Sequence, residues 1–110
     1  MMIARAVLLD GKLAGNIGSW LEDEKRLVGY WVDRRYWGRG VATEALRLFV
    51  AECQERPLNA WVATSNVAST RVLEKVGFIP SGEPHVGPDG TEERLYVLAE
   101  KHSSEVGGCV

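Results

Sequence analysis

The chain has 110 residues, 45% of them hydrophobic, which is enough for one domain with a single core. Its 13 Lys and Arg against 15 Asp and Glu leave a net charge of −2, so no overall basic field attracts nucleic acid. No apolar run is long enough to span a bilayer and no secretory leader is visible, so we expect a cytoplasmic protein without a membrane partner. Cys53 in a helical pattern and Cys109 in a polar tail argue against a structural disulfide, and we expect no metal site.

The first third of the chain predicts an antiparallel meander. Asp10-Gly11 favours a tight hairpin between strands over residues 3–9 and 12–20. A charged turn at residues 22–25 then leads into a third strand over residues 26–33.

The pattern becomes helical after two glycines. Ala42, Leu46 and Phe49 recur at helical spacing and predict a helix over residues 39–54. Pro57 ends this segment, and a strand follows over residues 58–64.

A second helix is predicted between a cap at Ser65 or Asn66 and Gly77. We expect Ala68, Val72 and Val76 to form its buried face. The remaining elements are a strand over residues 78–83, a loop over 84–90 and a last strand over 91–99. The resulting order, β-β-β-α-β-α-β-β, predicts an α/β (α+β) fold with a mixed, mainly antiparallel sheet in one domain over residues 1–100, followed by a loose polar tail over 101–110.

The loop with Gly38 and Gly40 leaves bare backbone where the first helix begins. The free N–H groups of the helix and the positive end of its dipole would both favour a phosphate there. The two glycines could also serve only to turn the chain. Gly38-x-Gly40-x-x-Thr43 lacks the third glycine of the dinucleotide fingerprint, and the Gly-Lys-Ser/Thr of the NTPase loop is absent.

Two motifs point to one family. Arg35-x-x-Gly38-x-Gly40-x-Ala42 is similar to the acyl-CoA pyrophosphate loop of the GNAT acetyltransferase superfamily, and the segment 66–78, ending in Lys75-Val76-Gly77-Phe78, resembles its second conserved motif. Together with residues 37–46 they look most like the branch of the RimJ/RimL ribosomal-protein acetyltransferases. The resemblance implies a GNAT-like domain, truncated at the N-terminus because the usual first strand and two helices have no counterpart here.

The resemblance also implies acetyl-CoA, or coenzyme A, as cofactor. Ser69 would steady the departing thiolate, since the usual tyrosine position holds Leu73. The backbone of Trp31 and Val32 would pair with pantetheine and help to polarise the thioester carbonyl. Asn66, Ser69 or Thr70, and Leu73 share a helix face that could line the ligand. The residues that the resemblance places at the cofactor are Trp31, Val32, Arg35, Gly38, Arg39, Gly40, Val41, Ala42, Thr43, Asn66, Ser69 and Thr70.

Several of these residues have simpler roles open to them. Asn66 could be only a helix cap, and Arg35 and Arg39 only surface charges. Trp61 is expected in the core, and His85 in a loop where it could face an acceptor.

The implied function is an N-acetyltransferase that moves an acetyl group from acetyl-CoA to an amine, either a protein N-terminus or a small amine, by direct attack. No base is evident, which leaves water, Glu83 or His85. The open acceptor side would favour a homodimer or a partner that completes it. A non-catalytic acyl-CoA-binding or assembly module is the alternative, and a dinucleotide-binding domain a more distant one.

Overall fold

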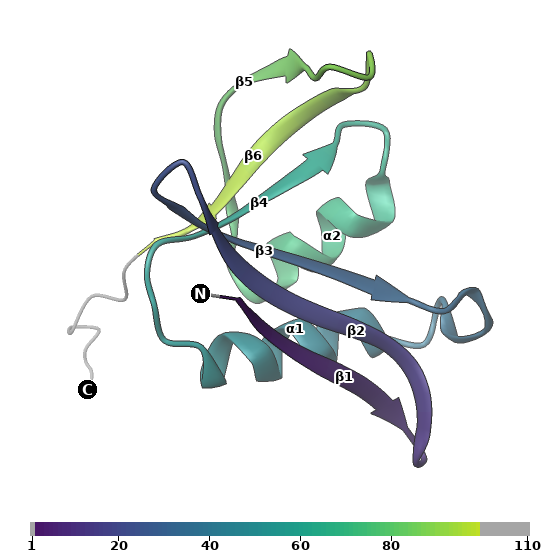
Figure 1. Ribbon diagram of the computed structural model, residues 1–110. Coiled ribbons are helices and arrows are strands. Elements are labelled where there is room, and N and C mark those ends of the chain that lie inside the picture. The colour runs from purple at the N-terminus through teal and green to yellow at the C-terminus, as the bar shows by residue number, and fades with distance from the viewer. Residues whose placement is uncertain (1, 100–110) are drawn as a thin grey trace.

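In the part of the chain that the structure describes, six strands form one mixed sheet in the order β1-β2-β3-β4-β6-β5, with two helices on one of its faces (Figure 1). The computed structural model describes residues 2–99, so the predicted tail, Cys109 and His102 lie outside the described residues. Within these residues, the pair of β3 and β4 is the only parallel one. The predicted element order is confirmed, with a short 3₁₀ turn added. The elements are β1 (Ile3–Leu9), β2 (Lys12–Glu22), β3 (Lys25–Val32), η1 (Arg34–Tyr36), α1 (Val41–Glu52), β4 (Leu58–Ala63), α2 (Val67–Val76), β5 (Ile79–Val86) and β6 (Glu92–Leu98).

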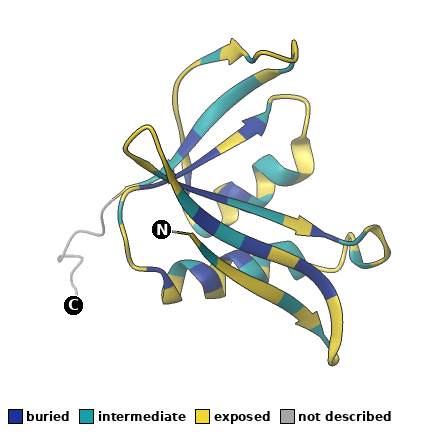
Figure 2. Ribbon diagram, in the orientation of Figure 1, coloured by how far each residue is buried: buried dark blue, intermediate teal, exposed yellow. Residues whose placement is uncertain are grey.

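The core lies between the sheet and the two helices (Figure 2). Leu46 and Phe49 of α1 and Leu73 of α2 pack in one cluster with strand residues such as Val28 and Leu58. These side chains alternate with outward-facing ones along each strand, which puts the apolar set on the helix side. Within residues 2–99, no helix covers the opposite face of the sheet, which we call the open face.

The predicted buried face of α2 was wrong in one respect. Ala68 is exposed, whereas Leu73 is 1% exposed and Val72 and Val76 are half-buried. The helix is therefore rotated so that Leu73 points into the core, and this side chain cannot line a ligand as the shared-face prediction required. The caps at Asn66 and Gly77 are as predicted, so the buried face is set by packing, with Leu73 in the core cluster.

The predictions for His85 and Trp61 were also wrong. β5 continues to Val86, so His85 is a strand residue and pairs with Glu93 of β6 across a register shift. Trp61 is 40% exposed because it points to the open face, where its ring meets the ring of His85 edge-on at 4.7 Å. Strand alternation, not hydrophobicity, decides its environment.

The parallel strands β3 and β4 stay paired over only two positions, Arg26 with Leu58 and Leu27 with Asn59. Asn59 closes the paired end with a side-chain bond from its Nδ2 to the carbonyl oxygen of Arg26, at 3.1 Å. Beyond that point the strands diverge, as Figure 1 shows. Their carboxyl ends are therefore separated by a gap, and α1 and α2 begin just beyond these two ends.

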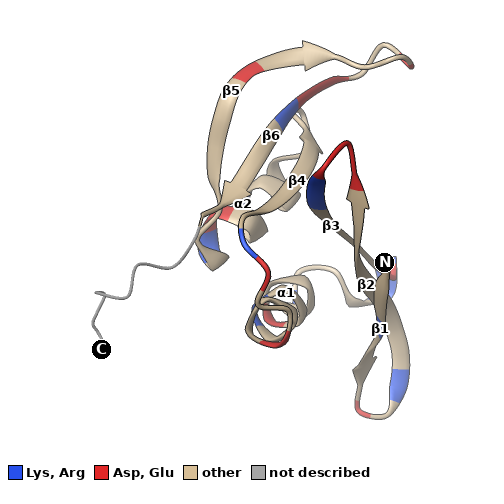
Figure 3. Ribbon diagram, turned by 60° about the vertical axis from the view of Figure 1, so that its left-hand side comes forward, with Lys and Arg blue, Asp and Glu red and all other residues tan. Residues whose placement is uncertain are grey.

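Charged residues are scattered over turns, strands and helices (Figure 3). Ion pairs join exposed or half-buried groups, among them Arg5 with Glu52 and Arg35 with Asp33. Between residues 2 and 99, no helix is long and apolar enough to cross a membrane.

Candidate functional site at the gap between β3 and β4

The glycine loop has the geometry that the sequence predicted. Gly38 and Gly40 have φ angles of 76° and 75°, in the left-handed region that favours glycine. An added Cβ at either position would meet nothing within 4 Å. Gly40 is the N-cap of α1 and has no side chain to accept a bond from the first turn. The amides of Val41, Ala42 and Thr43 therefore open α1 without a capping side chain, beside free space.

The loop is fastened to the end of β3 by side chains. The indole Nε1 of Trp37 donates to the carbonyl oxygen of Val32 at 2.8 Å. Asp33 caps η1 by accepting from the backbone N–H of Arg35 at 2.9 Å, and it also pairs with the Arg35 guanidinium at 3.1 Å. These bonds from Arg35 hold the pKa of the Asp33 carboxyl below its usual value.

Arginines surround the loop on its exposed side. Arg35 and Arg39 lie over the ring of Tyr36, with guanidinium carbons 5.6 and 5.8 Å from its centroid, and Arg34 lies 5.6 Å over Trp37. The aromatic rings keep three positive charges near the uncapped start of α1. An anion at this place would meet both amides and guanidinium groups.

Backbone alternation decides which groups of β3 face the gap. The N–H of Asp33 donates to Ala14 in β2, and the carbonyl of Arg26 points to β4. Because backbone groups alternate sides along a strand, those of Tyr30 and Val32 point to the gap and those of Trp31 point to β2. Of the two residues predicted to offer their backbone to the ligand, Val32 therefore turns its groups to the gap, whereas Trp31 does not. The Trp31 side chain, 54% exposed, lies on the open face.

The start of α2 forms the other side of the gap. Asn66 is its N-cap, and its Oδ1 accepts from the N–H of Ser69 at 3.1 Å. Thr70 donates its hydroxyl to the carbonyl of Asn66 at 3.0 Å. The Ser69 hydroxyl lies 2.7 Å from the hydroxyl of Tyr30. This last contact joins α2 to β3 across the opening.

Tyr30 is the functional candidate that the sequence analysis missed. Its ring is half-buried against the core, and this burial raises the pKa of its phenol, against a smaller lowering by the bond to Ser69. A signal was present, because Tyr30 lies two residues from both Val28 and Val32 and so shares their apolar strand face. A tyrosine on a buried strand face needs a partner for its hydroxyl.

The structure thus brings the predicted residues of two segments to one place. Those of the glycine loop follow the end of β3, and Asn66, Ser69 and Thr70 follow the end of the parallel strand β4. The two possible bases do not join them, since Glu83 and His85 lie on β5, two strands beyond β4 in the sheet. Parallel strands place their carboxyl ends at one edge, where α/β sheets commonly bind ligands.

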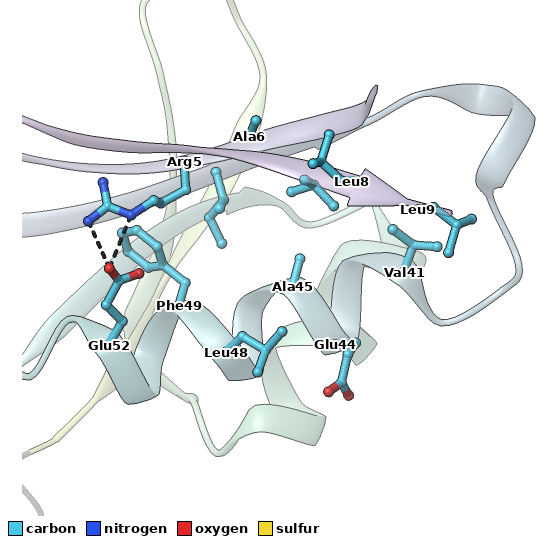
Figure 4. A pocket seen from close by; sticks show the side chains of 12 residues that line it. Arg5, Ala6, Leu8, Leu9, Val41, Glu44, Ala45, Leu48, Phe49 and Glu52 are labelled. Carbon is cyan, nitrogen blue, oxygen red and sulfur yellow. Dashed lines mark hydrogen bonds and ion pairs between the residues drawn. The ribbon is translucent and has the colours of Figure 1, made fainter. Parts of the chain in front are cut away.

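A cavity lies elsewhere, at the free edge of β1 (Figure 4). Its volume is about 330 Å³, and its walls are apolar side chains of β1 and α1 with the Arg5–Glu52 ion pair at one end. It shares only Val41 with the predicted cofactor residues. A second cavity of about 300 Å³ beside β4 and β6 shares only Thr70.

Comparisons with known proteins agree with this geometry. A family model described as an acetyltransferase (GNAT) domain matches residues 2–79. The chain is 38% identical over 78 residues to "Probable N-acetyltransferase YjcK" of Bacillus subtilis (strain 168), covering 66% of this chain and 43% of that protein. It is 32% identical over 107 residues to "Putative ribosomal N-acetyltransferase YdaF" of the same organism, covering 91% of this chain and 55% of that protein.

A solved structure of Mycobacterium smegmatis RimJ in complex with CoA-disulfide has the same fold, with a TM-score of 0.77 at 26% identity, covering 89% of this chain and 53% of that one. The chain spans about half the length of the curated relatives it matches. The family model covers the glycine loop, the gap and the whole of α2. The chain therefore belongs to the GNAT family of acetyltransferases.

Proposed function

We propose that this chain binds acetyl-CoA and transfers its acetyl group to an amine, either a protein N-terminus or a small amine. The observation that carries the proposal is the uncapped start of α1 behind Gly38 and Gly40, set beside a gap between parallel strands. RimJ, which shares the fold, is known in complex with a form of coenzyme A, and this supports the choice of cofactor.

The loop fits a pyrophosphate group. The amides from Gly38 to Thr43 would hold its oxygens, because the space beside both glycines is open. Arg39 and Arg35 would add charge-assisted bonds, for which Arg35 exchanges part of its pairing with Asp33. We therefore assign these residues to the phosphates.

The gap fits an amide-bearing chain such as pantetheine. Val32 and Tyr30 turn backbone groups into it, as an additional strand would require. On the other side, Asn66 uses its Oδ1 for the cap and has its amide nitrogen left to donate. Thr70 lies one position beyond Ser69, where its oxygen can still accept a bond.

Bound acetyl-CoA would supply an activated acetyl thioester. The N–H of Val32 would donate to the carbonyl oxygen as charge builds there, and the hydroxyl of Ser69 would donate to the sulfur. Neither β3 nor β4, the strands that border the gap, carries a carboxylate or an imidazole, so we assign the proton of the amine to water. An α-amino group, with a pKa of about 7.7–8.0, is then a better acceptor than lysine at about 10.4, because more of it is neutral.

The amine would approach from the open face. Trp31 and Trp61 lie exposed there on the two strands that border the gap, and indole faces attract cationic groups. Ile79 is 61% exposed on the same face. We expect a second copy of the chain or another partner to cover this surface, which light scattering after size-exclusion chromatography would detect as a mass above 12.1 kDa.

Titration calorimetry with coenzyme A tests the cofactor assignment. Gly40→Glu should weaken binding at least about tenfold, because a carboxylate then faces the pyrophosphate. Gly90→Glu is the matched control, since Gly90 also has a positive φ, of 86°, and free space around it, but lies in the turn before β6. Equal binding by wild type and Gly40→Glu, or no binding by either, would refute the assignment.

Turnover over a panel of amines tests the transferase. Release of free thiol that depends on an α-amino acceptor supports catalysis by this chain. Binding of acetyl-CoA without thiol release over the whole panel would instead identify a non-catalytic acyl-CoA-binding module.

A further inference from the structure

One contact at the gap joins two hydroxyl groups. The Tyr30 Oη and the Ser69 Oγ lie 2.7 Å apart, which is an ordinary length for an O–H···O bond. The carbonyl oxygen of Ser69 is the only other acceptor that the described residues place within 3.5 Å of the Tyr30 hydroxyl, and it lies at that limit. Both side chains are half-buried, so neither exchanges this contact freely for water.

The direction of this bond decides where the Ser69 proton points. If Ser69 donates to Tyr30, the Ser69 proton is occupied by that bond. The Tyr30 proton can then reach only the carbonyl oxygen of Ser69, at 3.5 Å. If Tyr30 donates to Ser69, the Ser69 proton is free to point to another acceptor. The second arrangement keeps the short bond and strengthens the remaining donor, because linked hydroxyl groups polarise one another.

Burial favours the protonated form of Tyr30, which is able to donate. Removal of the ring from water raises the pKa of the phenol, so the hydroxyl carries its proton throughout the neutral range. The tyrosine position that the resemblance suggested on α2 is filled by Leu73, which is buried in the core and has no proton to give. A hydroxyl on β3 therefore lies beside α2, where α2 itself provides only a serine.

We propose that Tyr30 is a positioning residue that turns the hydroxyl of Ser69 toward the sulfur of bound coenzyme A. The inference rests on the proposed function, since it requires the thioester end of the cofactor to lie in the gap.

The step balances without a net change in either residue. The lone pair of the amine nitrogen forms the new N–C bond, the C–S bond breaks, and its electron pair stays on the sulfur. Ser69 donates a hydrogen bond to that sulfur while Tyr30 donates one to Ser69. The proton that the amine loses passes through water to the thiolate, so Tyr30 and Ser69 keep their own protons.

The pKa of the bound coenzyme A thiol, followed by ultraviolet absorbance of the thiolate, tests this without turnover. Wild type should lower this pKa by about one unit relative to Tyr30→Phe, because a donor aimed at the thiolate favours the charged form. Ser69→Ala should lose the same stabilisation, and adding Tyr30→Phe to it should change nothing further. With acetyl-CoA, Tyr30→Phe should lower kcat about tenfold with little change in KM, since the bond strengthens as the sulfur gains charge.

Tyr96→Phe is the control, because it also removes one hydroxyl from a buried tyrosine and should leave the thiol pKa unchanged. An equal thiol pKa in wild type and Tyr30→Phe, both binding coenzyme A, would overturn the role of Tyr30 alone. If Tyr30→Phe still changes the thiol pKa when it is added to Ser69→Ala, then Tyr30 does not act through Ser69. Absence of coenzyme A binding by wild type would overturn the proposed function together with this inference.

Discussion

Gly15 in β2 sets the position of the β3 backbone at the gap. It lies opposite Val32, and a Cβ added to it would come 2.0 Å from the Trp31 carbonyl oxygen and 2.9 Å from the Val32 Cα. Real Cβ contacts essentially never fall under 3.0 Å, so Gly15→Ala has to separate the two backbones by about 1 Å. Neither contact belongs to a side chain that could turn away.

The expected cost has two parts. Overpacking at a rigid site costs about 1–3 kcal/mol, and the adjacent bond from the Asp33 N–H to Ala14, 2.7 Å long, adds about 1 kcal/mol if it breaks. A loss of about 2–4 kcal/mol is a large part of the 5–15 kcal/mol typical of a domain. At about 4–8 °C per kcal/mol, the Tm should fall by at least about 8 °C.

Thermal unfolding followed by circular dichroism measures this change. Gly87→Ala is the control, because its new Cβ would meet its neighbours only at 3.6 Å or more, which is ordinary contact. Coenzyme A affinity should fall in Gly15→Ala at temperatures where the variant is still folded, since the Val32 N–H moves with the strand. A Tm equal to that of wild type would refute the account of close approach at Gly15.

Three further changes separate the parts of the site. Trp37→Phe removes the indole bond to Val32 and should cost about 0.5–1.5 kcal/mol in urea unfolding, with weaker coenzyme A binding because the loop is released. Asp33→Asn should matter less as the pH falls, because the lowered pKa of Asp33 means that its bond to Arg35 stabilises the fold above the unfolded pKa of about 3.9 and is lost on acidification through the folded value. The difference in unfolding free energy between wild type and Asp33→Asn should therefore be smaller at acid pH than at neutral pH. Asn66→Ala should cost about 1 kcal/mol as a lost cap, whereas Asn66→Asp should keep the cap and lose coenzyme A affinity if the amide nitrogen holds the ligand.

The sequence was sufficient for features that depend on local chemistry. The hairpin at Asp10-Gly11, the turn conformations of Gly38 and Gly40 and the caps at Asn66 and Gly77 all come from a few neighbouring residues. Their preferences act before any tertiary contact forms, so the motifs and the element order could be predicted.

Features that depend on partners across the sheet could not be predicted in the same way. Trp61 is apolar but falls on the open face, because the register with β6 decides which side it takes. Tyr30 is a functional candidate because its hydroxyl contacts that of Ser69, which is 39 residues away in the chain. Such contacts arise from topology, so the pattern of β3 could show that the Tyr30 hydroxyl needs a partner but not that Ser69 provides it.

The gap between β3 and β4 leaves backbone groups without strand partners, which costs free energy. Unpaired backbone groups at a sheet edge need other partners, and full pairing of the two strands would supply them. Two contacts oppose that closure, since the Val32 carbonyl is already bonded to Trp37 and the Tyr30 side chain is bonded to Ser69. The N–H of Val32 and the backbone groups of Tyr30 are left for water or for a ligand. An extended chain with its own amides would offer partners to these groups, and we therefore propose that the gap and the glycine loop act as one binding site.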